Sequence, residues 1–180
     1  MIVFACENNG VNEESHNQIA SHMISGVDIS HYPKILSFNP TFYDENNNEV
    51  NFINSLIQNG VNTIRLRLWV NPIDESSSFQ EVKAFSDELK GLGFKILLTP
   101  HFSDTWAHPG QQQTPSQWSS LNFEELKNQV FNYTSEIMSE ISPDYIQIGN
   151  EINTGILFPH GRIQDNQDQF VELVKQGANA

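Results

Sequence analysis

An acid and an amide stand side by side at the end of one predicted strand. Residues 144–153 read Asp-Tyr-Ile-Gln-Ile-Gly-Asn-Glu-Ile-Asn, and the isoleucines and tyrosine favour a strand that ends near Glu151. A carboxylate at the end of a buried strand is unfavourable unless it is paired or used in chemistry. Glu151 could therefore take part in chemistry, with Asn150 directly before it. It could equally be an ordinary strand-edge residue that faces water.

Charged and polar residues also stand at the ends of three earlier predicted strands. These strands cover residues 26–30, 61–69 and 94–101, and their polar residues are Asp28, Arg65, Arg67 and His101. Strand alternation puts both arginines on one face of the second strand, with Ile64, Leu66 and Leu68 on the other. Two arginines on one face fit the interior of a barrel near its mouth, where buried guanidinium groups find carboxylates.

Helical patterns separate these strands. Apolar residues recur at helical spacing over residues 50–57, 79–92 and 123–141, and again around residues 170–174. Four strand–helix units predict a parallel sheet, either a doubly wound open sheet or a β/α barrel. No glycine-rich phosphate turn follows any strand, and polar residues gather at all four strand ends, which favours the TIM (β/α)8 barrel. Four units are half of such a barrel.

The composition restricts the classes of partner. The chain has 180 residues, enough for one domain, with 9 Lys and Arg against 22 Asp and Glu and a net charge of −13. This acidic balance argues against nucleic acid and against anionic membranes, which both require a basic face. No apolar run approaches the roughly 20 residues of a membrane span.

The N-terminus has two interpretations. Val3-Phe4-Ala5-Cys6 resembles the end of a bacterial lipoprotein signal, which implies an extracellular or cell-surface protein with a lipid on Cys6. Its apolar part is shorter than the roughly 7–15 residues of a complete signal, so an ordinary disordered N-terminus with one free thiol remains the alternative. In both cases residues 1–24 are expected to be a flexible tether, and residues 25–180 the barrel domain.

Four sequence blocks together resemble one enzyme family. They are residues 26–30, residues 60–72 (with Arg-Leu-Arg-Leu-Trp-Val-Asn-Pro), residues 101–106 (His-Phe-Ser-Asp-Thr-Trp) and residues 149–152 (Gly-Asn-Glu-Ile). In this order they are similar to the arabinogalactan endo-β-1,4-galactanases of glycoside hydrolase family 53. The resemblance runs from about residue 26 to residue 162. It implies a β/α barrel, retaining hydrolysis of galactan or arabinogalactan, and no cofactor.

The resemblance also implies roles for single residues. Glu151 matches the general acid/base, and retention requires a second carboxylate about 5–5.5 Å away as nucleophile. The acid must keep its proton near neutral pH, so its pKa has to be raised by its surroundings. Asn150 matches the donor to the sugar 2-hydroxyl. Arg65 matches an arginine that keeps the nucleophile ionised, although a purely structural ion pair is the alternative.

Other residues are expected to bind the sugar. His101 matches the histidine beside the catalytic subsite, and Arg67 joins it on the inner face of the predicted barrel. Trp106, in a loop, is the better stacking platform, whereas Trp69 could equally belong to the core. Asp28 is expected to orient a neighbour or a hydroxyl group rather than to do chemistry.

Two departures from the family pattern bear on activity. The family has Asp-Phe-His-Tyr on its third strand, where this chain has Thr-Pro-His-Phe at residues 99–102. The family nucleophile, and a calcium site in bacterial members, belong to the second half of the barrel. We therefore expect the chain to carry the first four units and to be inactive alone. Two alternatives remain, a non-catalytic carbohydrate-binding remnant and a related retaining β-glycanase.

Overall fold

The computed structural model describes residues 23–180. The predicted tether lies outside these residues except for Met23 and Ile24, both of which are exposed, and so does Cys6. No helix of the described part combines the length and the apolar character that a membrane crossing requires.

A four-stranded parallel sheet forms the centre of the fold. It consists of β1 (Gly26–Asp28), β4 (Thr63–Leu68), β5 (Lys95–Pro100) and β6 (Tyr145–Ile146), in the order β1-β4-β5-β6. The spatial order follows the chain order, so each connection advances by one strand in the same direction. A doubly wound sheet reverses its strand order at a switch point, and this sheet does not. The topology is that of consecutive units of a β/α barrel.

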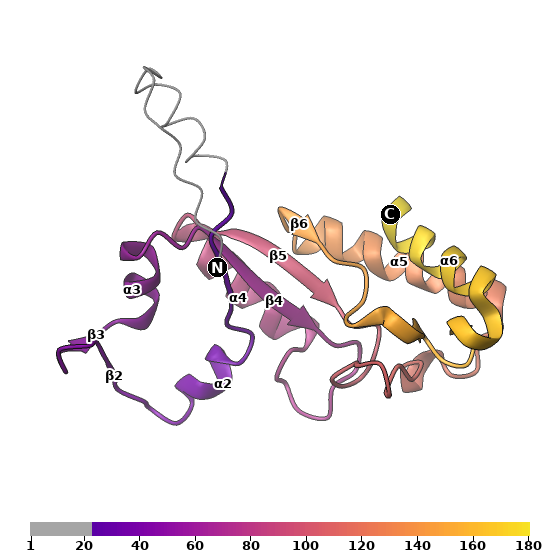
Figure 1. Ribbon diagram of the computed structural model, residues 1–180, viewed down its shortest axis with the longest axis horizontal. Coiled ribbons are helices and arrows are strands. Elements are labelled where there is room, and N and C mark those ends of the chain that lie inside the picture. The colour runs from indigo at the N-terminus through magenta and orange to yellow at the C-terminus, as the bar shows by residue number, and fades with distance from the viewer. Residues whose placement is uncertain (1–22) are drawn as a thin grey trace, which may run out of the picture.

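Three helices connect the strands of the sheet, α3 (Phe52–Gln58), α4 (Phe79–Gly91) and α5 (Phe123–Glu140), and each begins at a residue suited to a helix start. A fourth helix, α6 (Ile163–Asn179), follows the last strand. Asn51, Ser78 and Asn122 each accept a hydrogen bond from a backbone N–H of the first turn of α3, α4 and α5. Asn122 also forms a capping box with Glu125. Figure 1 shows α4 behind β4 and β5, and α5 beside α6.

The two faces of the sheet differ in chemistry. Ile64, Leu66 and Leu68 of β4 are fully buried, and they join β5, α4 and α5 residues in one apolar core. Arg65 and Arg67 alternate with them and lie on the opposite face, as predicted. The core therefore holds the helices against one face and leaves the polar side chains together on the other.

Short elements occur where the sequence predicted only loops. The helix α2 (Tyr32–Leu36) and the hairpin of β2 (Phe42–Tyr43) and β3 (Glu49–Val50) lie between β1 and α3. A 3₁₀ turn, Ser116–Trp118, interrupts the loop after β5. After β6 come a 3₁₀ turn, Ile152–Thr154, and a hairpin of β7 (Gly155–Ile156) and β8 (Gly161–Arg162).

The strand β6 is shorter than predicted. Its ladder continues after Ile146 through two hydrogen bonds, from the Gln147 N–H to the Leu98 carbonyl (2.8 Å) and from the Gly149 N–H to the Pro100 carbonyl (3.2 Å). Gly149 then adopts a φ of 78°, which ends the extended conformation. Strand alternation continued to Glu151 would put it on the same face as Tyr145, but it does not apply there because the backbone turns between them.

Candidate active site

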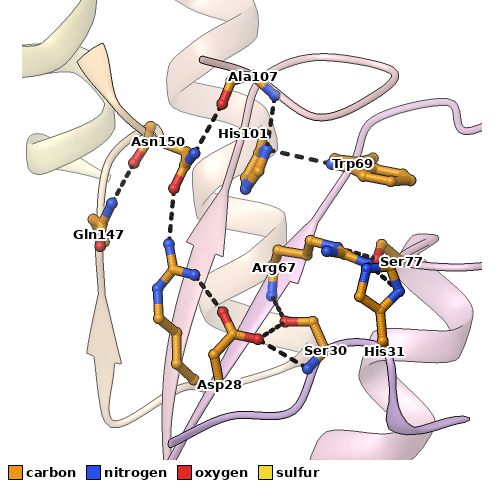
Figure 2. A network of polar contacts seen from close by, with 12 residues as sticks. Asp28, Ser30, His31, Arg67, Trp69, Ser77, His101, Ala107, Gln147 and Asn150 are labelled. Carbon is orange, nitrogen blue, oxygen red and sulfur yellow. Dashed lines mark hydrogen bonds and ion pairs between the residues drawn. The ribbon is translucent and has the colours of Figure 1, made fainter. Parts of the chain in front are cut away.

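Three of the predicted site residues form one hydrogen-bonded row across the strand ends. The Arg65 guanidinium contacts the Asp28 carboxylate through Nη1 and donates from Nη2 to Asn150 Oδ1 at 2.9 Å. The Asp28 carboxylate also accepts from Ser30, from Oγ at 2.6 Å and from the backbone N–H at 3.0 Å. Figure 2 shows Asp28 and Asn150 at the two ends of this row. The strands β1 and β4 and the turn after β6 thus bring together residues up to 122 positions apart in chain order.

The Asp28 carboxylate is fully engaged in this row. Burial alone raises the pKa of Asp28, but the hydrogen bonds from Ser30 and the contact with Arg65 outweigh burial and hold the pKa below its ordinary value. Asp28 is therefore an ionised partner that orients Arg65. This agrees with the expectation that it positions a neighbour.

The orientation of the Asn150 amide follows from its two partners. Its Oδ1 faces the Arg65 guanidinium, and its Nδ2 donates to the carbonyl of Ala107 at 2.8 Å. The flipped amide would set donor against donor and acceptor against acceptor. Asn150 is buried, so no bulk water relieves such a mismatch. Within residues 23–180 the Nδ2 group makes no second hydrogen bond, and the role of Asn150 as a donor to a sugar hydroxyl stays a prediction.

His101 is held as a neutral imidazole with a defined tautomer. Its Nδ1 accepts hydrogen bonds from the Trp69 indole N–H (3.3 Å) and from the Ala107 backbone N–H (3.1 Å). The ring proton must therefore reside on Nε2, which is buried and has no partner among residues 23–180. Burial, followed by the charges of Arg65 and Arg67, lowers the pKa of His101 to about 3. His101 thus offers an unused N–H donor at neutral pH.

The Arg67 side chain belongs to a neighbouring cluster, which the Arg67 backbone joins to the row by donating from its N–H to Ser30 Oγ at 2.9 Å. Its Nε donates to Ser77 Oγ at 2.9 Å, and its Nη2 lies 2.7 and 2.9 Å from the two ring nitrogens of His31. Its guanidinium carbon lies 4.9 Å from the ring centroid of Trp69 and 5.2 Å from that of Trp106. In Figure 2 the side chain of Arg67 points toward His31 and Ser77.

This environment corrects the expectation that both arginines pair with carboxylates. Arg67 is only 2% exposed, yet within the described part of the chain no Asp or Glu oxygen lies within 4.0 Å of it. Neutral and aromatic groups surround the charge instead. Burial and the charge of Arg67 both lower the pKa of His31, so His31 can accept from the guanidinium. His31 had no signal in the sequence beyond being a polar residue just after a predicted strand.

Glu151 follows Asn150 directly but has a different setting. Its backbone is left-handed, with φ 47° and ψ 46°, and its side chain is exposed. Within residues 23–180 no hydrogen bond involves its carboxylate. The described residues therefore put Glu151 at the predicted rim, but they do not form the enclosure that acid catalysis requires.

A residue that the sequence did not indicate holds this turn. The Gln112 amide donates from Nε2 to the backbone carbonyls of Asn150 (2.8 Å) and Glu151 (3.3 Å). Gln112 is only 1% exposed, although it lies in a loop between two other glutamines. A buried glutamine in a polar loop could have been a signal, but only burial distinguishes it from its neighbours.

Two tryptophans differ in their exposure to solvent. The Trp106 side chain is 40% exposed, and its ring meets the His101 ring edge to face at 5.4 Å. Trp118 is buried and packs against Phe102 and Tyr133. Phe102, two residues after the end of β5, thus takes an apolar role.

On β5 a threonine takes the position of the carboxylate in the family pattern. Thr99 stands at that position, paired in register with Arg67, and its Oγ1 is buried without a hydrogen-bond partner among the described residues. The described residues contain no group of three or more His, Cys, Asp or Glu side chains that could hold a metal ion.

The sequential parallel strands and the polar row at their carboxyl ends place the chain among the β/α-barrel proteins. Residues 24–180 match the profile of Glycosyl hydrolase family 53, and the chain belongs to this family. The family membership agrees with the resemblance carried by the four sequence blocks.

Similar proteins cover the chain well but extend beyond it. The arabinogalactan endo-beta-1,4-galactanase A of Emericella nidulans is 39% identical over 128 residues, which are 68% of this chain and 36% of that protein. A protein of Niallia circulans described as uncharacterized, in the bgaB 5' region, is 32% identical over 87% of this chain and 46% of its own length. The chain thus spans a third to a half of the curated relatives it matches.

Solved structures give the same result for the fold. The GH53 catalytic domain of Ignisphaera aggregans superposes with a TM-score of 0.80 at 37% identity, over 87% of this chain and 47% of that domain. A fungal β-1,4-galactanase superposes with a TM-score of 0.77 at 33% identity, over 85% of this chain and 47% of that chain. The described sheet and helices therefore correspond to part of a GH53 barrel.

Proposed function

We propose that the protein containing this chain hydrolyses β-1,4-galactosidic linkages inside galactan or arabinogalactan with retention of configuration, with Glu151 as acid/base. The observation that carries the proposal is the row of Asp28, Arg65 and Asn150, which leads to Glu151 at the strand ends of a family 53 chain. Galactanase names among its relatives support galactan as the substrate.

The chemistry assigns a separate task to each group. Glu151 protonates the oxygen of the leaving sugar and later deprotonates the water that releases the product. The free Nδ2 hydrogen of Asn150 donates to a hydroxyl of the sugar under attack. The Nε2–H of His101 supplies a second donor, and the exposed face of Trp106 suits the C–H surface of a galactose ring.

The attacking carboxylate has no candidate among the described residues. Asp28 is bound by Arg65 and Ser30. The acids Asp165, Asp168 and Glu172 lie in α6, which packs on α5 and the β7–β8 hairpin. We therefore expect residues 1–180 by themselves to be inactive on galactan. Surface attachment through Cys6 stays a prediction, because that residue lies outside the described part.

A second candidate is carbohydrate binding without hydrolysis. The exposure of Glu151 favours it, because an acid catalyst works best when it is shielded from bulk water. In that case the chain would bind galactan through Trp106, His101 and Asn150 and release no product.

The test uses the protein as its gene encodes it, with galactan, mannan and xylan as substrates. We expect new reducing ends from galactan only, and a loss of about 10²–10⁴-fold in Glu151→Gln. Glu140→Gln, which removes an exposed carboxylate at the end of α5, is the matched control and should keep full activity. An undiminished rate in Glu151→Gln would refute the role of Glu151. Retarded migration in galactan-containing gels without product would favour the binding function.

A further inference from the structure

The backbone around Glu151 adopts a conformation that its own residues do not favour. Gly149 has a φ of 78° and Glu151 a φ of 47°, and the second value is uncommon for any residue with a side chain. Such conformations persist only where the surroundings hold them. The turn points the Asn150 side chain into the polar row and starts the 3₁₀ turn that begins at Ile152.

The Gln112 side chain is the contact that spans this turn. One amide group serves two successive carbonyls, those of Asn150 at 2.8 Å and Glu151 at 3.3 Å. Because the two carbonyls belong to neighbouring peptides, a single donor group can reach both only when the backbone between them is turned. Burial of Gln112 keeps water from replacing the contact.

The backbone at Gln112 is itself held by contacts with the segment that follows Glu151 in the chain. Its backbone carbonyl accepts from the Phe158 N–H at 2.7 Å, and Thr114 Oγ1 donates to the Phe158 carbonyl at 2.9 Å. The loop that carries Gln112 also contains Ala107, which binds both His101 and Asn150. The amide thus approaches Glu151 from a loop anchored at both ends of the site.

We propose that Gln112 is a positioning residue that holds Glu151 in its left-handed conformation, so that the carboxyl group meets the oxygen of the leaving sugar. The proposal rests on the proposed function for its kinetic consequence, but the conformational claim stands on the contacts alone. Gln112 itself does not touch the substrate.

The kinetic test compares Gln112→Met with Gln113→Met in the protein as its gene encodes it. Methionine keeps the length of the side chain and removes the donor, and Gln113 is the exposed neighbour of the same type. We expect kcat on galactan to fall about 10- to 100-fold in Gln112→Met, with KM changed by less than about threefold, because a small displacement of a reacting group costs this much. Gln113→Met should match the wild type.

A second substrate separates positioning from general damage. An aryl β-galactobioside with a good leaving group needs little protonation, so its glycosylation step should be nearly unaffected in Gln112→Met. A structural defect would slow both substrates equally, and that result would overturn the proposal. Gln112→Asn, which keeps a buried amide but is one methylene shorter, should give a smaller loss of the same kind and replaces Gln112→Met if that variant does not fold.

A crystal structure of the variant tests the conformation without any activity. In Gln112→Met we expect the φ of Glu151 to leave the positive range or residues 150–152 to lose order. An unchanged turn would overturn the proposal even if activity fell. If the wild type does not cleave galactan, the proposed function fails, and the structure of the variant still decides whether Gln112 holds Glu151.

Discussion

Protonation of His101 should destabilise the fold below pH 6.5. In the unfolded chain this ring has its ordinary pKa of about 6.5, whereas burial lowers the pKa to about 3 in the folded chain. Between these values the unfolded state binds more protons, so stability increases with pH. The contribution is fully present above pH 6.5 and is lost progressively as the pH falls toward 3.

The magnitude at pH 5 follows from this difference. That pH is 1.5 units below the ordinary pKa of the ring. The ring is therefore almost fully protonated in the unfolded chain and neutral in the folded chain. At about 1.4 kcal/mol per pH unit the loss is about 2 kcal/mol. A small domain has a total stability of about 5–15 kcal/mol, so the effect is easily measured.

The measurement is urea unfolding of the wild type and His101→Asn at pH 5 and pH 7.5. The asparagine Oδ1 can accept from Trp69 and Ala107 but does not titrate. The pKa of His31 is also lowered, but its titration contributes to the pH dependence of stability in both proteins. The titration of Asp28 affects stability only below its ordinary pKa of 3.8. The difference between the two proteins therefore isolates His101.

We expect the wild type to lose about 2 kcal/mol more than His101→Asn between pH 7.5 and pH 5. Nitrogen NMR shifts of the His101 ring at pH 7 should show a protonated Nε2 and an unprotonated Nδ1. Equal pH dependence in the two proteins, or a ring that titrates near pH 6.5, would refute the assignment of a buried, neutral imidazole.

Two further substitutions test the row and the turn. Arg65→Lys should lower kcat about tenfold, because one ammonium group cannot reach both the Asp28 carboxylate and the Asn150 side-chain amide. An unchanged kcat would contradict the role of Arg65 in connecting these two residues. Gly149→Ala should lower the unfolding free energy by about 1–3 kcal/mol, because its Cβ would lie 2.6 Å from Ile152 Cγ2 at a φ of 78°. Gly91→Ala is the control in the same urea experiment. A Cβ added at Gly91 would have no neighbouring atom within 4 Å, so this substitution should not destabilise the chain.

The sequence predicted the elements whose signals are local. The helix α5 has both its capping box at Asn122 and Glu125 and a long apolar stripe, and the structure has the helix where the pattern predicts it. The alternation of β4 likewise assigned Arg65 and Leu66 to opposite faces. The short α2 and the two-residue strands β2 and β3 were missed, because segments of this length depend on tertiary packing.

The site was predictable only in part, because some of its contacts depend on residues distant in sequence. Asp28 and Arg65 were expected at adjacent strand ends, and the parallel pairing brings them together. The conformation of Glu151 could not be predicted, because alternation assumes an extended backbone and the turn involves Gln112, 39 positions earlier. His31 could not be expected beside Arg67, because a carboxylate is the usual partner of a buried guanidinium.

The contacts of Ala107 have a consequence for how this site can be studied. Its N–H fixes the tautomer of His101 and its carbonyl fixes the amide of Asn150, so both contributions come from its backbone. Scanning mutagenesis to alanine passes over such a position, and comparison of residue identities among relatives records only that a small side chain fits there. Replacing the amide linkage between Trp106 and Ala107 with an ester, which deletes the Ala107 N–H and leaves every side chain in place, would reveal what the contact with His101 contributes.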